Sequence, residues 1–148
     1  GLHNILFVFG AVRIEDNDAL PDISALASLA TAGHVVIRGN RALTTLARPS
    51  LPTSTLGSLV IEGNLQLRDL NGLENLRNFT AVDSAFGGFS LLIANNPSLT
   101  QIDALTFVTS ASGGVAIRNN TQLTQVDGLY NLQSTPFVQL QVSNRACA

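Results

Sequence analysis

Two carboxylates are the first residues whose type and spacing suggest chemistry. Asp103 and Asp127 open the phrases DALTFV and DGLYNL, 24 residues apart. Were that spacing one turn of a repeat, the side chains would lie on adjacent turns, an arrangement used for polysaccharide hydrolysis or Ca²⁺ binding. Such an Asp also caps backbone N–H groups at a turn, as Ser24 and Asn71 can do in the same column. We expect capping, with calcium binding and hydrolysis as alternatives.

The two histidines offer little support for other chemistry. His3 and His34 have no further Cys or His at metal-ligand spacing, so a zinc site is not expected. A Ser/His/Asp triad stays open from the sequence, although no G-x-S-x-G motif is present. With no catalytic motif, cofactor motif or metal motif, we predict that the chain is not an enzyme and needs no cofactor.

The composition describes a globular chain of low charge. The chain has 148 residues, 45% of them apolar and 12% charged, and its net charge is −2. This length and apolar content predict one domain with a real core. Nucleic-acid binding is not expected, because it needs a clustered basic surface. The apolar run Ile5–Phe9 is far too short to cross a membrane.

A repeated pattern organises the chain. Five segments share the order apolar, any, Ile, any, any, Asn, any, any, Leu, any, any, apolar. Their asparagines follow one another at intervals of 23, 24, 32 and 24 residues. A near-constant period predicts a solenoid in which each unit is one turn, here called a coil. The five segments are VRIEDNDALPDI (12–23), VVIRGNRALTTL (35–46), LVIEGNLQLRDL (59–70), LLIANNPSLTQI (91–102) and VAIRNNTQLTQV (115–126).

Each position of the repeated pattern has a structural explanation. Aliphatic residues alternate with other residues before the Asn, which predicts a half-buried strand in each coil and a parallel sheet across coils. The residue before each Asn is Gly, Asn or Asp, the types that tolerate a left-handed conformation. We therefore expect a tight turn there, with the motif Asn buried and hydrogen-bonded along the stack. This structural Asn ladder comprises Asn17, Asn40, Asn64, Asn96 and Asn120.

The predicted fold is thus β-rich: a right-handed parallel β-helix, or solenoid, of about five coils of about 24 residues. We expect one domain over residues 1–148, with five coils at 12–138. Residues 1–11 form a preceding half-coil or cap whose ILFVF run is a buried strand. The 32-residue interval places a loop insertion at 77–90, and 139–148 form an incomplete sixth coil.

One exposed column carries charges of alternating sign. The residue after each motif Ile is, in chain order, Glu15, Arg38, Glu62, Ala94 and Arg118. Side chains at strand spacing can pair, contributing roughly 0.2–1 kcal/mol for each exposed pair. We interpret the column as a solvated face that sets the register of the strands, with a binding patch as the alternative.

Two sequons and one cysteine suggest an extracellular setting. Asn78-Phe-Thr80 and Asn119-Asn-Thr121 both match the N-glycosylation pattern, and we expect accessible sites, Asn78 first. Cys147 is the single cysteine and cannot form a disulfide within the chain. In a secreted protein it would pair with another molecule, so we predict an intermolecular disulfide, with a free thiol as the alternative.

The spacing of Asn and Leu resembles a known family. Leucine-rich repeats place the Asn two residues before the next Leu, whereas here the two are three residues apart. The phrases I-x-x-N-P-x-L-x-x-I at Ile93–Ile102 and D-G-L-x-N-L at Asp127–Leu132 resemble the receptor L domain. That family includes ligand-binding lobes of growth-factor receptors and surface proteins of fungi and microbes. The resemblance covers about residues 12–133 and implies the same solenoid, although the cysteines that frame receptor L domains are absent.

The resemblance implies a function without chemistry. We expect a non-enzymatic recognition or adhesion module, extracellular or at the cell surface, whose partner is a protein or a glycan. A second hypothesis is a structural subunit of an extracellular filament, wall or appendage, which binds copies of itself through open coil ends. An enzyme built around Asp103 and Asp127 is the third.

Overall fold

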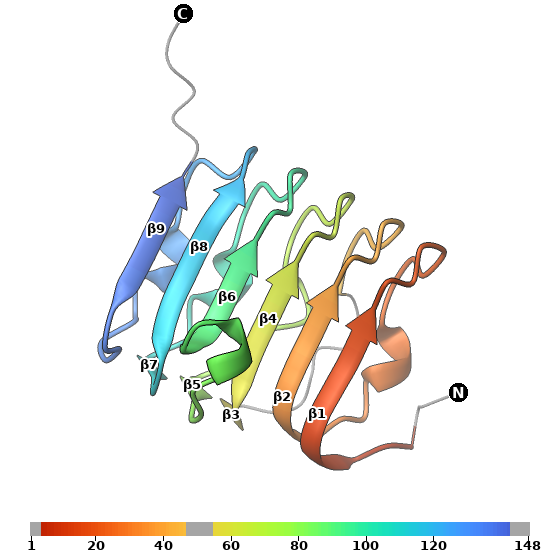
Figure 1. The fold of residues 1–148 in the computed structure, drawn as a ribbon, viewed down its shortest axis with the longest axis horizontal. Coiled ribbons are helices and arrows are strands. Elements are labelled where there is room, and N and C mark those ends of the chain that lie inside the picture. Colours follow the sequence, from red (N-terminus) through yellow and green to blue (C-terminus); the bar gives the residue numbers. More distant parts are fainter. Residues whose placement is uncertain (1–3, 47–54, 143–148) are drawn as a thin grey trace, which may run out of the picture.

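The fold follows the repeat. In a computed structural model, which describes residues 4–46 and 55–142, one strand from each coil joins a six-stranded sheet (Figure 1). Every neighbouring pair in this sheet is parallel, as a solenoid requires. The order of strands is β1 (Phe7–Glu15), β2 (Thr31–Arg38), β4 (Ser58–Glu62), β6 (Phe89–Ala94), β8 (Gly114–Asn120) and β9 (Val138–Val142).

The aliphatic columns of the repeat lie in register and form the core. The motif isoleucines Ile37, Ile61, Ile93 and Ile117 align on consecutive strands, and each has an exposed fraction of 0%. The Leu column after each Asn is buried as fully from the second coil onward. The predicted β-rich solenoid with parallel sheets is therefore confirmed.

A second, smaller sheet is formed by short strands that come before β4, β6 and β8 in the chain. Its strands β3 (Thr55–Leu56), β5 (Asn78–Phe79) and β7 (Ser110–Ala111) are also parallel. Short 3-10 helices follow the motif in three coils, and one lies in the insertion. These are η1 (Ser24–Leu26), η2 (Ser84–Phe86), η3 (Asp103–Leu105) and η4 (Asp127–Leu129). One hydrophobic cluster contains buried residues from both sheets.

The turn before each motif Asn is left-handed, as predicted. Asp16, Gly39, Gly63, Asn95 and Asn119 have φ values between 56° and 69°. This turn carries the chain out of the strand and sends the next side chain, the motif Asn, into the core. Asn40, Asn64, Asn96 and Asn120 are at most 1% exposed, as predicted, whereas the prediction was wrong for Asn17, which is exposed because its coil lies at the edge of the sheet.

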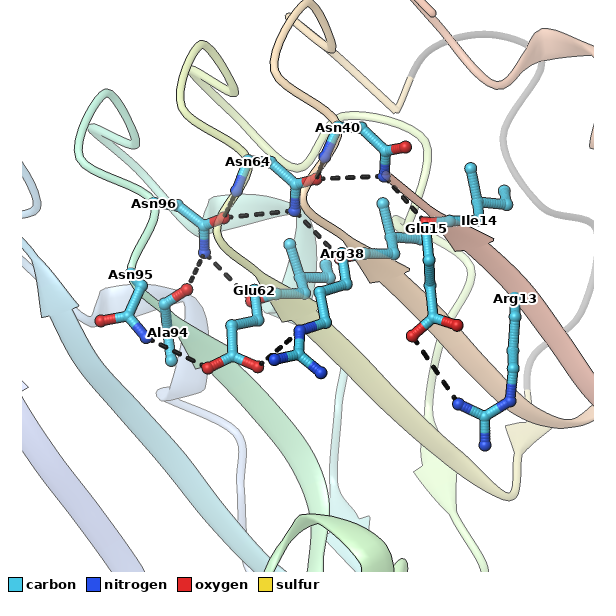
Figure 2. A network of polar contacts seen from close by, with 12 residues as sticks. Arg13, Ile14, Glu15, Arg38, Asn40, Glu62, Asn64, Ala94, Asn95 and Asn96 are labelled. Carbon is cyan, nitrogen blue, oxygen red and sulfur yellow. Dashed lines mark hydrogen bonds and ion pairs between the residues drawn. The ribbon is translucent and has the colours of Figure 1, made fainter. Parts of the chain in front are cut away.

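The motif asparagines are hydrogen-bonded from coil to coil (Figure 2). The Oδ1 of Asn64 accepts the backbone N–H of Asn40 at 3.1 Å and its side-chain amide at 3.2 Å. The Nδ2 of Asn64 donates to the carbonyl of Ile37, one coil back, at 3.0 Å. The same bonds link Asn17 to Asn40, Asn64 to Asn96, and Asn96 to Asn120.

The apolar run near the N-terminus is less buried than expected. Phe7 and Phe9 lie in β1 but are 60% and 94% exposed, and Leu6 is 50% exposed. The prediction of a buried strand was wrong because β1 is the edge of the sheet. Residues Phe7–Ala11 belong to the same strand as the first motif, so they do not form a separate half-coil.

The insertion is shorter than the predicted range 77–90. Asn78–Phe79 forms β5 and Phe89–Ala94 forms β6, so both ends of that range belong to strands. The loop proper is residues 80–88 and contains η2, which Figure 1 shows in front of β4 and β6. The two-residue strand β5 could not be located from a period-2 pattern, which needs a longer run.

The expected caps at Asp103 and Asp127 are not formed. Each residue begins a 3-10 helix, η3 or η4, without a side-chain cap. In two other coils, the capping residue is an Asp that lies two positions before the predicted one. The Oδ1 of Asp22 accepts the backbone N–H and hydroxyl of Ser24, and Asp69 accepts the N–H of Asn71. The hydroxyl and then the N–H of Ser24 hold the pKa of the Asp22 carboxyl below its ordinary value.

Asn71 and Glu74 have the spacing of a capping box but do not form one. Glu74 accepts the backbone N–H of Gly72, at 2.9 and 3.0 Å from its two oxygens, rather than the N–H of Asn71.

At the C-terminal side, β9 continues the sheet as a sixth strand beside β8. Cys147 and the incomplete coil beyond Val142 lie outside the described residues.

Candidate binding face

The outward face of the large sheet runs across all six of its strands. Alternate residues of each strand face outward, so His34, Val36 and Arg38 share this side of β2, while Val35 and Ile37 face the core. Val36 aligns with Val60, Leu92 and Ala116 in an apolar row whose members are at most 2% exposed. The charged row, Glu15 to Arg118, runs beside it near the ends of the strands.

The charged row is paired across coils as well as along a strand. Arg38 Nε lies 3.5 Å from the carboxylate of Glu62 on the next coil, with their side chains 53% and 21% exposed. Glu15 pairs instead with Arg13 of its own strand at 3.8 Å. Figure 2 shows both pairs on the same side of the sheet. Since the arginines are exposed and the glutamates partly exposed, each pair adds at most about 1 kcal/mol, and the arginines are the partners more accessible to a ligand.

Two turn asparagines extend this row. The Nδ2 of Asn95 donates to Glu62 at 3.1 Å, and the Nδ2 of Asn119 donates to Asn95 Oδ1 at 3.1 Å. Arg38, Glu62, Asn95 and Asn119 thus form one continuous polar strip over four coils. Asn119, a predicted glycosylation site, is exposed at its left-handed turn. A glycan on its Nδ2 would replace one donor proton of the amide that contacts Asn95.

The other sequon lies elsewhere. Asn78 is half-buried in β5, between β3 and β7, rather than in the insertion loop where we expected it. Its Oδ1 accepts the hydroxyls of Thr109 at 3.2 Å and Ser110 at 2.8 Å. The two sequons are therefore far apart in role: Asn78 belongs to the small sheet, and Asn119 lies at the left-handed turn that ends β8 in the large sheet.

A Ser, a His and an Asp meet on the binding face. His34 Nδ1 lies 2.8 Å from Ser58 Oγ and 3.5 Å from Asp83 Oδ2, and Ser58 Oγ donates to Asp83 at 3.2 Å. In a catalytic triad the two imidazole nitrogens serve different partners, Ser at Nε2 and Asp at Nδ1. Here one nitrogen faces both, and Ser58 is 0% exposed. This cluster has the geometry of a tether, and not of a nucleophile with its base.

The tether holds the insertion against the sheet. Asp83 also caps η2 by accepting the N–H of Ala85, and its backbone N–H donates to the carbonyl of Phe89. Phe86 of the loop packs on an apolar cluster that includes Val60 and Leu92. The loop is therefore a fixed ridge on the binding face, packed against a row of apolar side chains that are all buried.

Sequence reasoning missed this cluster, although half of its signal was present. His34 and Ser58 are 24 residues apart, which is one coil, so the repeat itself places them side by side. Asp83 follows Ser58 by 25 residues but reaches it from the insertion, which the period does not describe.

Asp103 and Asp127 lie away from this face, at the start of η3 and η4. No group of three or more His, Cys, Asp or Glu side chains gathers as a metal site within residues 4–46 and 55–142. Across the same residues, no helix has the length and apolar character of a membrane span.

Comparison with known proteins identifies the architecture. The model of one protein family, described as Receptor L domain, matches residues 33–135, which is most of the chain. The chain belongs to the receptor L domain family. Neither the curated proteins nor the solved structures contain a match to it. The predicted resemblance is therefore confirmed for coils two to five, which this match covers.

Receptor L domains are ligand-binding, non-catalytic modules. Domains of this family occur in the extracellular parts of cell-surface receptors. Within such a domain, the regular strands supply a rigid support, and residues that project from them meet the partner.

Proposed function

We propose that this receptor L domain is an extracellular recognition or adhesion module that binds a protein or glycan at the cell surface. Its binding surface is the outward face of the six-stranded sheet. The observation that supports this most is the polar strip of Arg38, Glu62, Asn95 and Asn119, bordered by the ridge of the insertion. The strip offers donors and acceptors at fixed spacing, because each residue comes from a different rigid coil.

The test uses the labelled 148-residue chain on cell surfaces and on arrays of purified glycans and ectodomains. In the variant Arg38→Glu, we expect binding to fall about tenfold or more, since a charge contacting the partner is reversed. The control is Asp127→Lys, which reverses an exposed charge on η4, away from the proposed surface. Equal loss in both variants, or no binding by the parent chain, would contradict this function.

A second candidate is a structural subunit of a filament, wall or appendage. The observation in its favour is that β1 and β9 form the two edges of the large sheet and no described strand pairs with their outer sides. Open edges can join end to end. Sedimentation velocity with and without reductant tests it: rods that dissociate in reductant implicate Cys147, rods that persist implicate the coil edges, and a concentration-independent monomer rejects it.

A further inference from the structure

The Asn ladder is incomplete at its N-terminal end. Asn40 Oδ1 accepts the N–H and the Nδ2 of Asn17, but Asn17 Oδ1 accepts no hydrogen bond within the described residues. The Nδ2 of Asn40 donates to Ile14, one coil back, whereas the Nδ2 of Asn17 turns to the carbonyl of Glu15 in its own coil at 3.0 Å. Asn17 is therefore arranged like the others, but no described coil lies before it.

The backbone of β1 is open in the same direction. Asp16 N–H donates to the carbonyl of Arg38 on β2. Along a parallel strand, the backbone N–H and C=O groups of successive residues point to opposite sides. The backbone groups of Val12 and Ile14 therefore point toward β2, on the same side as the N–H of Asp16. The backbone N–H and C=O groups of Arg13 and Glu15 point away from β2, toward an edge that no described strand covers.

Apolar side chains surround this edge. A cavity of about 270 Å³ is lined mainly by Val12, Ile14, Leu20, Ile23 and Leu26, with Asn17 at its border. Three of these columns are closed in the next coil, where Val35 is 1% exposed and Ile37 and Leu43 are 0% exposed. The cavity is thus the surface that one coil normally presents to its neighbour.

We propose that this N-terminal end face binds one further coil, supplied by a partner polypeptide that carries the repeat's own strand, turn and Asn pattern. Its strand would pair with Arg13 and Glu15, and its Asn would donate to Asn17 Oδ1. Its Leu and aliphatic residues would fill the cavity. The site is built by the fold alone and holds under either proposed function.

Charge selects among such coils. The charged row alternates in sign where Glu15, Arg38 and Glu62 align in register on neighbouring strands. A coil placed before β1 aligns its corresponding residue with Glu15, so it should carry Arg. The segment Val35–Leu46, VVIRGNRALTTL, has Arg at that position and is the matched probe.

The experiment adds the labelled VVIRGNRALTTL peptide to the complete 148-residue chain. Fluorescence anisotropy measures affinity, and amide hydrogen exchange locates the peptide. We expect saturable binding, with exchange at Arg13 and Glu15 slowed about tenfold or more at saturation. In the peptide, Arg38→Glu and Asn40→Ala should each weaken binding, the first by like charge at Glu15 and the second by loss of the donor to Asn17.

Matched protein variants test the edge itself. Arg13→Pro removes an outward-facing N–H without taking a bond from β2, so binding should be lost. Arg13→Ala removes the same side chain and should bind like the parent. The peptide variants keep the test decisive even if Arg13→Pro proves unstable. Absence of binding, indifference to Asn40→Ala, or protection at Val138–Val142 instead would overturn the proposal.

Discussion

At the scale of single residues, the motif Asn does work that no apolar residue in its place can do. Each left-handed turn leaves backbone groups inside the solenoid, and a buried group without a partner costs about 1–3 kcal/mol. Asn64 satisfies two of them with one side chain, accepting the backbone N–H of Asn40 and donating to the carbonyl of Ile37, and it also accepts the side-chain amide of Asn40. A carboxylate could accept but not donate, and a hydroxyl is too short, which explains why the column is Asn alone.

We therefore expect Asn64→Ala to lower the free energy of unfolding by about 3–5 kcal/mol, the range for breaking a buried polar network. Asn17→Ala is the matched control, because Asn17 is exposed and the substitution leaves its backbone bond to Asn40 intact. That variant should lose only about 0.5–1.5 kcal/mol. Urea unfolding measures both. Similar losses at the two positions would show that the ladder is not what holds the turns.

At the scale of elements, the insertion is fixed at few points, and Asp83 combines most of them. Its carboxylate accepts a hydrogen bond from the hydroxyl of Ser58, lies near His34 and caps η2. Phe86 supplies the apolar contact. Because the loop adds a ridge to the binding face without joining the sheet as a strand, its position depends on these contacts together with a few backbone bonds, such as that from Asp83 to Phe89.

Asp83→Ala should release this loop while leaving the solenoid folded. We expect limited proteolysis within residues 80–88 to accelerate about tenfold, which corresponds to about 1.4 kcal/mol of lost tethering. Asp103→Ala is the control, because that Asp is exposed and its side chain caps nothing. Unchanged cleavage in Asp83→Ala would show that Phe86 and the backbone suffice to hold the loop.

The repeat predicted those elements whose position recurs and failed where the period was broken. The parallel strands, the left-handed turns at residues such as Gly39 and Asn95, and the buried Asn column all follow from one 12-residue pattern. The exposure of Phe9 was missed because a local apolar run does not reveal that its strand is an edge. The tether at Asp83 was missed because it comes from an insertion whose path depends on tertiary contacts.

At the scale of the whole molecule, the coils contact their neighbours in order along one axis, as Figure 1 shows. Stability in such an array is close to a sum of coil and interface terms, so a coil with one neighbour is held less firmly than a coil with two. The first coil shows this in its side chains. Val12 and Ile14 are only partly buried, whereas Leu59 and Ile61 in the third coil are 0% exposed.

Native-state hydrogen exchange should therefore rank the strands by their distance from the ends. We expect amides of β4 and β6 to exchange only through global unfolding, and those of β1 and β9 to exchange through local opening at least about 2 kcal/mol lower. The ladder makes the same prediction, since Asn64 and Asn96 are bonded on both sides and Asn17 on one. A single opening free energy for all strands would mean that the solenoid unfolds as one unit. If the VVIRGNRALTTL peptide slows exchange in β1 but not in β9, the N-terminal edge is where the array accepts another coil.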